Sequence, residues 1–185
     1  MNKDINSHTV IVLMEYKNQE FESETFDKID FSTGSLENTS FIDCVFEECN
    51  LSNLELQNTS FQNATFRECK LLGLDFTRCN KFLLDMRFES STVSMCNFSD
   101  LDLKGTSFLS CQVHDCIFFR AVLARTDFEG SDLQGSKFQD ADLSDASFKR
   151  ATRYTIDPTQ NILYKAKFSL PEAASLLDVF EIEIE

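Results

Sequence analysis

The chain has 185 residues, enough for one domain with a sizeable core but too few to make a second domain expected. Its 17 basic and 31 acidic residues give a net charge of −14, which argues against direct binding to nucleic acid because phosphates would meet no positive surface. The 19 Phe residues contrast with only 5 Gly and 2 Pro, so a regular scheme other than elements joined by tight turns must place the rings.

Residues 1–19 precede the regular part of the sequence. Their only apolar stretch runs over five residues, Val10 to Met14, which is too short for a signal peptide or a membrane span. We therefore predict a cytoplasmic protein that does not enter a membrane. The stretch is long enough to lie across an open end of the fold, so residues 1–19 are predicted to form an N-terminal cap.

Residues 20–150 repeat with a period of five. A large apolar residue occupies every fifth position from Phe21 to Phe76, and the series resumes at Leu83 and continues to Phe148, which gives 26 repeats. This period fits neither a helix nor a strand, so each unit must place one apolar residue inward and then turn. The residue two positions earlier is nearly always small, as at Cys44 and Ala141. Large and small residues at a fixed offset predict a narrow interior.

Several units, among them ADLSD (141–145), SDLQG (131–135), TDFEG (126–130) and CNLSN (49–53), resemble the pentapeptide repeat family, whose consensus is A(D/N)Lxx. The resemblance implies an all-β solenoid, a right-handed quadrilateral β-helix in which four pentapeptides form one square coil. The 26 repeats would then make about 6.5 coils. Residues 20 apart should stack, and the sequence supports this independently, because like residues recur at that interval: Phe21, Phe41 and Phe61; Phe26, Phe46 and Phe66; Phe88, Phe108, Phe128 and Phe148; Leu83, Leu103, Leu123 and Leu143; Phe98, Phe118 and Phe138.

The repeat is interrupted near residues 77–82, where the segment TRCNKF carries two extra residues. One interpretation is a tolerated bulge between two stacked halves. The other is a contact loop that presents Arg78, Lys81 and Phe82 to a partner.

Residues 151–185 are predicted to form a separate C-terminal segment with a short helix and a strand. Ser169 and Glu172 have the spacing of a capping box ahead of AASLLDVF, and FEIEIE alternates as a strand does. This segment resembles the C-terminal module of Qnr-type and MfpA-type quinolone-resistance proteins, and the resemblance implies a homodimer joined end to end. The interface would contain Leu170, Leu176, Leu177, Phe180, Ile182 and Ile184. The alternative is a cap folded onto its own coil.

The seven cysteines occupy the small inward position of the repeat, which predicts that they are core residues and neither metal ligands nor disulfides. His8 and His114 have no Cys or carboxylate neighbours at the spacing of metal ligands. The sequence also lacks phosphate-binding loops and paired-carboxylate motifs. We therefore expect no catalytic, cofactor-binding or metal-binding residues, and no enzymatic activity.

Two functions of different classes remain. The first is a scaffold whose coil faces bind a protein partner, with a candidate apolar patch formed by Ile117, Phe119 and Val122. The second, implied by the resemblance, is a DNA mimic that binds a type II topoisomerase, DNA gyrase or topoisomerase IV, and modulates or protects it against a quinolone or a toxin. Residues 20–80 hold 12 acidic and 4 basic residues, and the candidate acidic surface there consists of Glu47, Glu48, Glu55, Glu68 and Asp75.

Overall fold

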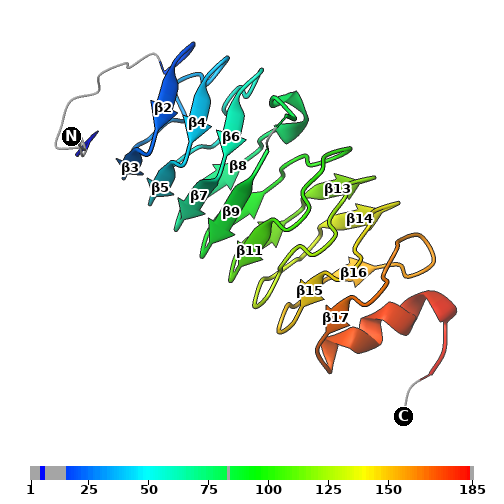
Figure 1. Cartoon of the computed structure of the whole chain (residues 1–185). Helices are drawn as coiled ribbons and strands as arrows, with labels where there is room; N and C mark the ends of the chain where they lie inside the picture. Colours follow the sequence, from blue (N-terminus) through cyan, green and yellow to red (C-terminus); the bar gives the residue numbers. More distant parts are fainter. Residues whose placement is uncertain (1–4, 7–15, 83, 184–185) are drawn as a thin grey trace.

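A computed structural model describes residues 5–6, 16–82 and 84–183. The chain winds into a β-solenoid in which strands of successive coils pair in parallel (Figure 1). Short strands form because each side of a coil holds only five residues, of which about three are extended before the chain turns. The predicted fold class is confirmed, with seven steps of stacking along its longest column.

Four stacks of strands make up the sides of the solenoid. The longest sheet contains β1 (Ile5–Asn6), β3 (Thr25–Asp27), β5 (Val45–Glu47), β7 (Ala64–Arg67), β9 (Met86–Glu89) and β11 (Ser107–Leu109), and it belongs to the same side as β15 (Ser147–Phe148) and β17 (Lys167–Phe168). The other sheets are β2 (Glu20–Glu22), β4 (Ser40–Ile42) and β6 (Ser60–Gln62); β8 (Lys70–Leu72), β10 (Thr92–Ser94) and β12 (Gln112–His114); and β13 (Ile117–Phe119), β14 (Lys137–Gln139) and β16 (Thr155–Ile156).

The core is a set of columns of identical side chains. Eight Phe rings stack with centroids 4.8–5.1 Å apart, at Phe26, Phe46, Phe66, Phe88, Phe108, Phe128, Phe148 and Phe168. This spacing matches the distance between hydrogen-bonded strands, so each ring lies flat on the next without distorting the backbone. The seven cysteines are buried in the small inward positions, as predicted.

The two extra residues at the break are absorbed without interrupting the columns. Across the break the stacking interval rises from 20 to 22 residues, yet Phe66 and Phe88 stack at 5.1 Å and Phe76 and Phe98 at 4.6 Å. A short 3-10 helix, η1 (Phe76–Arg78), begins after Asp75, whose carboxylate accepts a hydrogen bond from the Thr77 N–H. The sequence predicts one column that ends at Phe66 and another that begins at Phe88. The structure joins them into a single column. Leu83 lies outside the described residues.

The coil continues beyond the boundary predicted at residue 151. Ile156 pairs with Phe138 and Phe168 with Phe148, and Tyr154 is buried against the rings of the last coil. The regular period hides this coil because Ile156 follows Phe138 by only 18 residues. The turn at residues 157–160 then restores the interval of 20, since the Leu143 N–H donates to the Ile162 carbonyl.

The C-terminal segment contains a 3-10 helix, η2 (Glu172–Phe180), that lies at the end of the solenoid (Figure 1). The Ser169 hydroxyl does not cap it, because that oxygen accepts the Arg150 N–H at 3.1 Å instead. The strand predicted from FEIEIE does not form over residues 181–183, since Glu181 takes a left-handed conformation with φ of 51° and ends the helix. In the predicted N-terminal cap, Tyr16 covers Phe31 with centroids 4.8 Å apart, whereas Val10 to Met14 lie outside the described residues.

Candidate functional site

The side chains capable of nucleophilic chemistry or metal binding are mostly enclosed in the core. Burial raises the pKa of Cys79 and of Cys111 to about 12, so both thiols are protonated near neutral pH. His114 contacts the Asp132 carboxylate at 2.8 Å, and Arg153 pairs with the same carboxylate. Among the described residues no group of three or more His, Cys, Asp or Glu side chains is placed to hold a metal ion. His8 lies outside them.

The candidate acidic residues divide into two places. Glu47, Glu48 and Glu68 lie on or beside the long sheet that contains β5 and β7. The Arg67 guanidinium lies between two carboxylates, with Nη1 3.1 Å from Glu47 and Nε 3.0 Å from Glu89. Both hydrogen bonds raise the pKa of Arg67, and the one to Glu89 has the larger effect.

Part of the negative charge on this side is therefore neutralised. Glu48 pairs with Lys28 at 3.2 Å, and the hydrogen bond that the Lys28 ammonium donates to this carboxylate raises the pKa of the lysine. The predicted stacking of Asp27 on Glu47 is present, but Arg67 is the next residue in the same column. Opposite charges one coil apart offset the repulsion expected between like charges.

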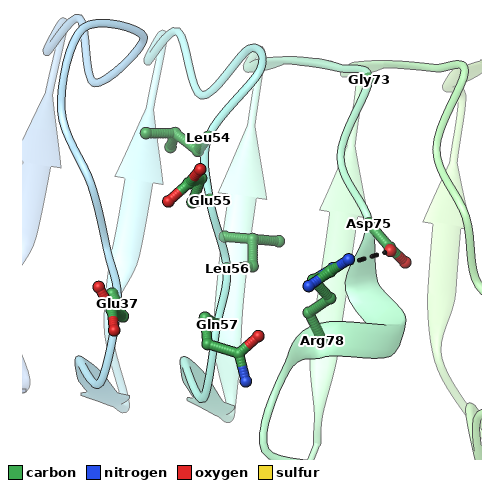
Figure 2. A pocket seen from close by; sticks show the side chains of 8 residues that line it. All are labelled: Glu37, Leu54, Glu55, Leu56, Gln57, Gly73, Asp75 and Arg78. Atoms are coloured by element: carbon green, nitrogen blue, oxygen red, sulfur yellow. Dashed lines mark hydrogen bonds and ion pairs between the residues drawn. The ribbon is translucent and has the colours of Figure 1, made fainter.

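The other two acidic residues line a groove of about 440 Å³ on the N-terminal half of the solenoid (Figure 2). Its lining consists of Glu37, Leu54, Glu55, Leu56, Gln57, Gly73, Asp75 and Arg78. The Asp75 carboxylate is already used, because it accepts from the Thr77 hydroxyl at 2.6 Å and contacts Arg78 Nε at 3.4 Å. The three carboxylates meet two cations, because Lys17 pairs with Glu37 and Arg78 with Asp75, so the groove keeps a small excess of negative charge.

The candidate apolar patch covers one corner of a coil. Ile117 and Phe119 flank the buried Phe118 on β13, and Val122 follows on the next side. Ile117 is 43% exposed and Val122 37% exposed, whereas the Arg120 guanidinium covers the Phe119 ring at 4.7 Å from its centroid. Arg120 also pairs with Asp100 at 2.7 Å. The patch is therefore partly screened by a charged side chain.

Five of the six predicted dimer residues are described by the structure, and they lie on or beside η2. Leu170 is 82% exposed and Phe180 53% exposed, Leu177 and Ile182 are also exposed, and only Leu176 packs against the core. Ile184 lies outside the described residues. Because exposed apolar side chains gather on this one segment, the segment is a candidate contact surface.

Sequence reasoning did not identify the groove or the exposed side chains of the last coil. Ile162 and Tyr164 are 58% and 64% exposed. They belong to a coil that departs from the five-residue period, so no inward or outward assignment was available for them. The groove depends on side-chain conformations across three coils, which the repeat pattern does not specify.

Comparison with known proteins decides the family. Residues 39–118 match a pentapeptide repeat region, and residues 116–152 match the model of pentapeptide repeats in eight copies. The chain belongs to the pentapeptide repeat family. No curated protein is significantly similar to it in sequence.

Solved pentapeptide repeat structures resemble the chain over most of its length. A trypsin-treated variant of QnrB1, a plasmid-mediated fluoroquinolone resistance protein, is 21% identical, with 95% of this chain and 94% of that chain covered and a TM-score of 0.51. A second trypsin-treated QnrB1 variant is 21% identical over 92% of each chain, with a TM-score of 0.47. HetL, involved in heterocyst differentiation regulation in the cyanobacterium Nostoc, is 18% identical over 85% of this chain and 84% of that one, with a TM-score of 0.33. At these identities the similarity concerns the fold.

Proposed function

We propose that the protein is a non-enzymatic scaffold that binds another protein through outward side chains of its coils. One observation carries the proposal: large apolar side chains are exposed on outward positions of the coils in the C-terminal half, at Ile117, Val122, Ile162 and Tyr164. A stable monomer gains nothing from exposing such residues, and apolar patches of this kind commonly mark protein contacts. The burial of all seven thiols also favours a role without nucleophilic chemistry.

Crosslinking in cells, followed by affinity purification, tests this proposal. The wild type is compared with Ile117→Ser, Phe119→Ser and Val122→Ser combined, and with the control Val45→Ser on β5, which changes a similar side chain on another side. The proposal expects a partner that the wild type and the control retain and the triple variant loses. A set of crosslinked proteins that is the same for all three would contradict it.

A second proposal is that the rod acts as a DNA mimic on a type II topoisomerase. It is supported by the net charge of −14 and by the groove in the N-terminal half, where three carboxylates meet two cations, Arg78 and the Lys17 that pairs with Glu37. A DNA-binding surface is basic, so an acidic rod can compete for it, and the attraction should be screened by salt over about 8 Å at physiological ionic strength.

A gyrase supercoiling assay at low and high salt tests the second proposal. Replacing Glu47, Glu48, Glu55, Glu68 and Asp75 by Gln should abolish an effect of the wild type on the enzyme. The fold should survive, because exposed ion pairs such as Lys28–Glu48 contribute only about 0–1 kcal/mol each. An effect that the five substitutions leave unchanged, or the absence of an effect from the wild type at low salt, would rule the mimic out.

We also propose that two copies associate through the C-terminal segment. The exposed apolar side chains of Leu170, Leu177, Phe180 and Ile182 support this proposal, because a second copy would bury them. Its test is given in the Discussion.

A further inference from the structure

One outward column in the C-terminal half alternates acidic and apolar side chains. Asp102, Val122, Asp142 and Ile162 occupy equivalent positions in four successive coils and pair in register as β-bridges. Val122 is 37% exposed, Ile162 is 58% exposed, and Tyr164 lies two residues beyond Ile162 on the same side. The column thus presents apolar contacts two coils apart with a carboxylate midway between them.

The two carboxylates of this column are not engaged with cations in the described part of the chain. Each accepts a backbone N–H two residues later, Asp102 from Lys104 at 3.1 Å and Asp142 from Ser144 at 3.0 Å. By contrast, the nearby Asp100 pairs with Arg120 and Glu129 with Arg150. The column therefore has unused negative charge on both sides of Val122, which a cation from outside can meet.

The spacing selects the secondary structure of the occupant. Successive coils are separated by 4.8–5.1 Å, as the stacked Phe88, Phe108 and Phe128 rings show. One turn of an α-helix rises about 5.4 Å, so a helix parallel to the solenoid axis drifts by only about 1–2 Å over the three intervals of the column. In an extended strand, side chains on one side recur every 6.6–6.8 Å or so and lose register by roughly a full coil over the same length.

We propose that this column docks an amphipathic helix of a partner protein that lies parallel to the solenoid axis. Apolar side chains at positions i and i+7 of the helix contact Val122 and Ile162. Lys or Arg side chains at i−4 and at i+3 or i+4 pair with Asp102 and Asp142. The proposal rests on the scaffold function and adds the class of ligand and its orientation.

Basic side chains beside the column restrict the basic residues of the partner helix to the single side that faces the column. Lys104 lies two residues after Asp102, and Arg125 and Lys165 follow at the corner, so a helix that is basic all round would be repelled there. The Lys165 ammonium lies over the Tyr164 ring, 5.0 Å from its centre, yet Tyr164 remains 64% exposed and so is open to apolar contact. The best ligand thus has a line of alternating apolar and basic residues flanked by acidic ones.

The test uses two fluorescein-labelled peptides of about twenty residues. The first is stapled as a helix and carries Leu at i and i+7 with Lys at i−4 and i+4. The second has the same composition and staple, but its Leu and Lys follow one another every second residue, as they would along one side of a strand. Fluorescence anisotropy measures the affinity of each for the full chain, and circular dichroism verifies that every protein variant is folded.

The first peptide should bind at least tenfold more tightly than the second. Val122→Ser with Ile162→Ser, and separately Asp102→Asn with Asp142→Asn, should each weaken it at least tenfold. The matched controls are Val45→Ser and Asp127→Asn, which alter another side of the solenoid and should change little; Asp127 likewise accepts a backbone N–H two residues later, at 3.0 Å.

Equal affinity for the two peptides, or equal losses in the controls and the column variants, would overturn the docking proposal. The same holds if the first peptide does not bind at millimolar concentration. The scaffold function survives such a failure if the triple substitution of Ile117, Phe119 and Val122 abolishes crosslinking to a partner in cells. If no crosslinked partner depends on those residues, the scaffold function fails as well.

Discussion

Truncation of a ring in the middle of the longest column should be far more costly than truncation at the end of the solenoid. Phe108 is fully buried, stacks on Phe88 at 4.8 Å and on Phe128 at 5.1 Å, and contacts Phe98 and Phe118 edge to face. Phe→Ala in a core costs about 3–5 kcal/mol, and each lost aromatic pair adds roughly 0.5–1.5 kcal/mol to simple burial. We therefore expect Phe108→Ala to lower the free energy of unfolding by about 5 kcal/mol.

Phe21→Ala provides the matched control. Phe21 belongs to the first coil and is only partly buried; among the described residues it stacks on Phe41 alone, at 5.5 Å, and has one edge-to-face neighbour, Phe26, and one tilted neighbour, Tyr16. In a solenoid each coil contacts only its neighbours, so an end position loses contacts on one side alone. We expect a cost of about 2 kcal/mol. Urea unfolding followed by far-ultraviolet circular dichroism measures both, and equal costs within about 0.5 kcal/mol would refute the column model.

Three further predictions concern other parts of the chain. Gly135→Ala should destabilise the fold by more than the roughly 1 kcal/mol expected from its φ of 71° alone, because a Cβ at this position would lie 2.2 Å from Asp115 Oδ1. Gly105→Ala is the control, because Gly105 also has a positive φ but has open space around it. Thermal unfolding measures both variants, and equal shifts of Tm would exclude the clash. All seven thiols should react with a thiol reagent only after denaturation, because all seven are buried in the core where the reagent cannot reach them; fast labelling of the native protein at pH 7 would contradict this. Leu177→Glu with Phe180→Glu should convert a dimer into a soluble monomer in light scattering, and an unchanged mass would remove the proposed end-to-end contact.

The inward part of the structure could be predicted from the sequence because one period specifies it. Each inward position of the repeat is confined by the rings above and below, so Phe108 or Cys111 can take only one role once the period is known. The C-terminal coil escaped prediction because Tyr154 and Ile156 depart from the period, although they fill the same interior. Backbone hydrogen bonds to the preceding coil compensate for the irregular spacing there.

The outward positions could be predicted only in part. Their register follows from the period, which is why Asp27 stacks on Glu47 as expected. Ion pairing does not follow, since the contact of Arg67 with both Glu47 and Glu89 depends on the 22-residue interval across the break. The partial burial of Phe119 could not be predicted either, because the sequence does not show that Arg120 folds over its ring.

Because the Phe rings stack without interruption across the break, the solenoid holds its two halves at a fixed distance along its axis. Because Phe66 stacks on Phe88 at 5.1 Å, within the 4.8–5.1 Å range of the whole column, the acidic coils and the apolar coils belong to one stiff body. Glu48 and Val122 lie between three and four coils apart, an axial separation of about 17 Å that side-chain motion can change by only a few ångströms. A partner that contacts both must match this length in its own structure, so the number of coils between the two surfaces would select the partner as strictly as the side chains do.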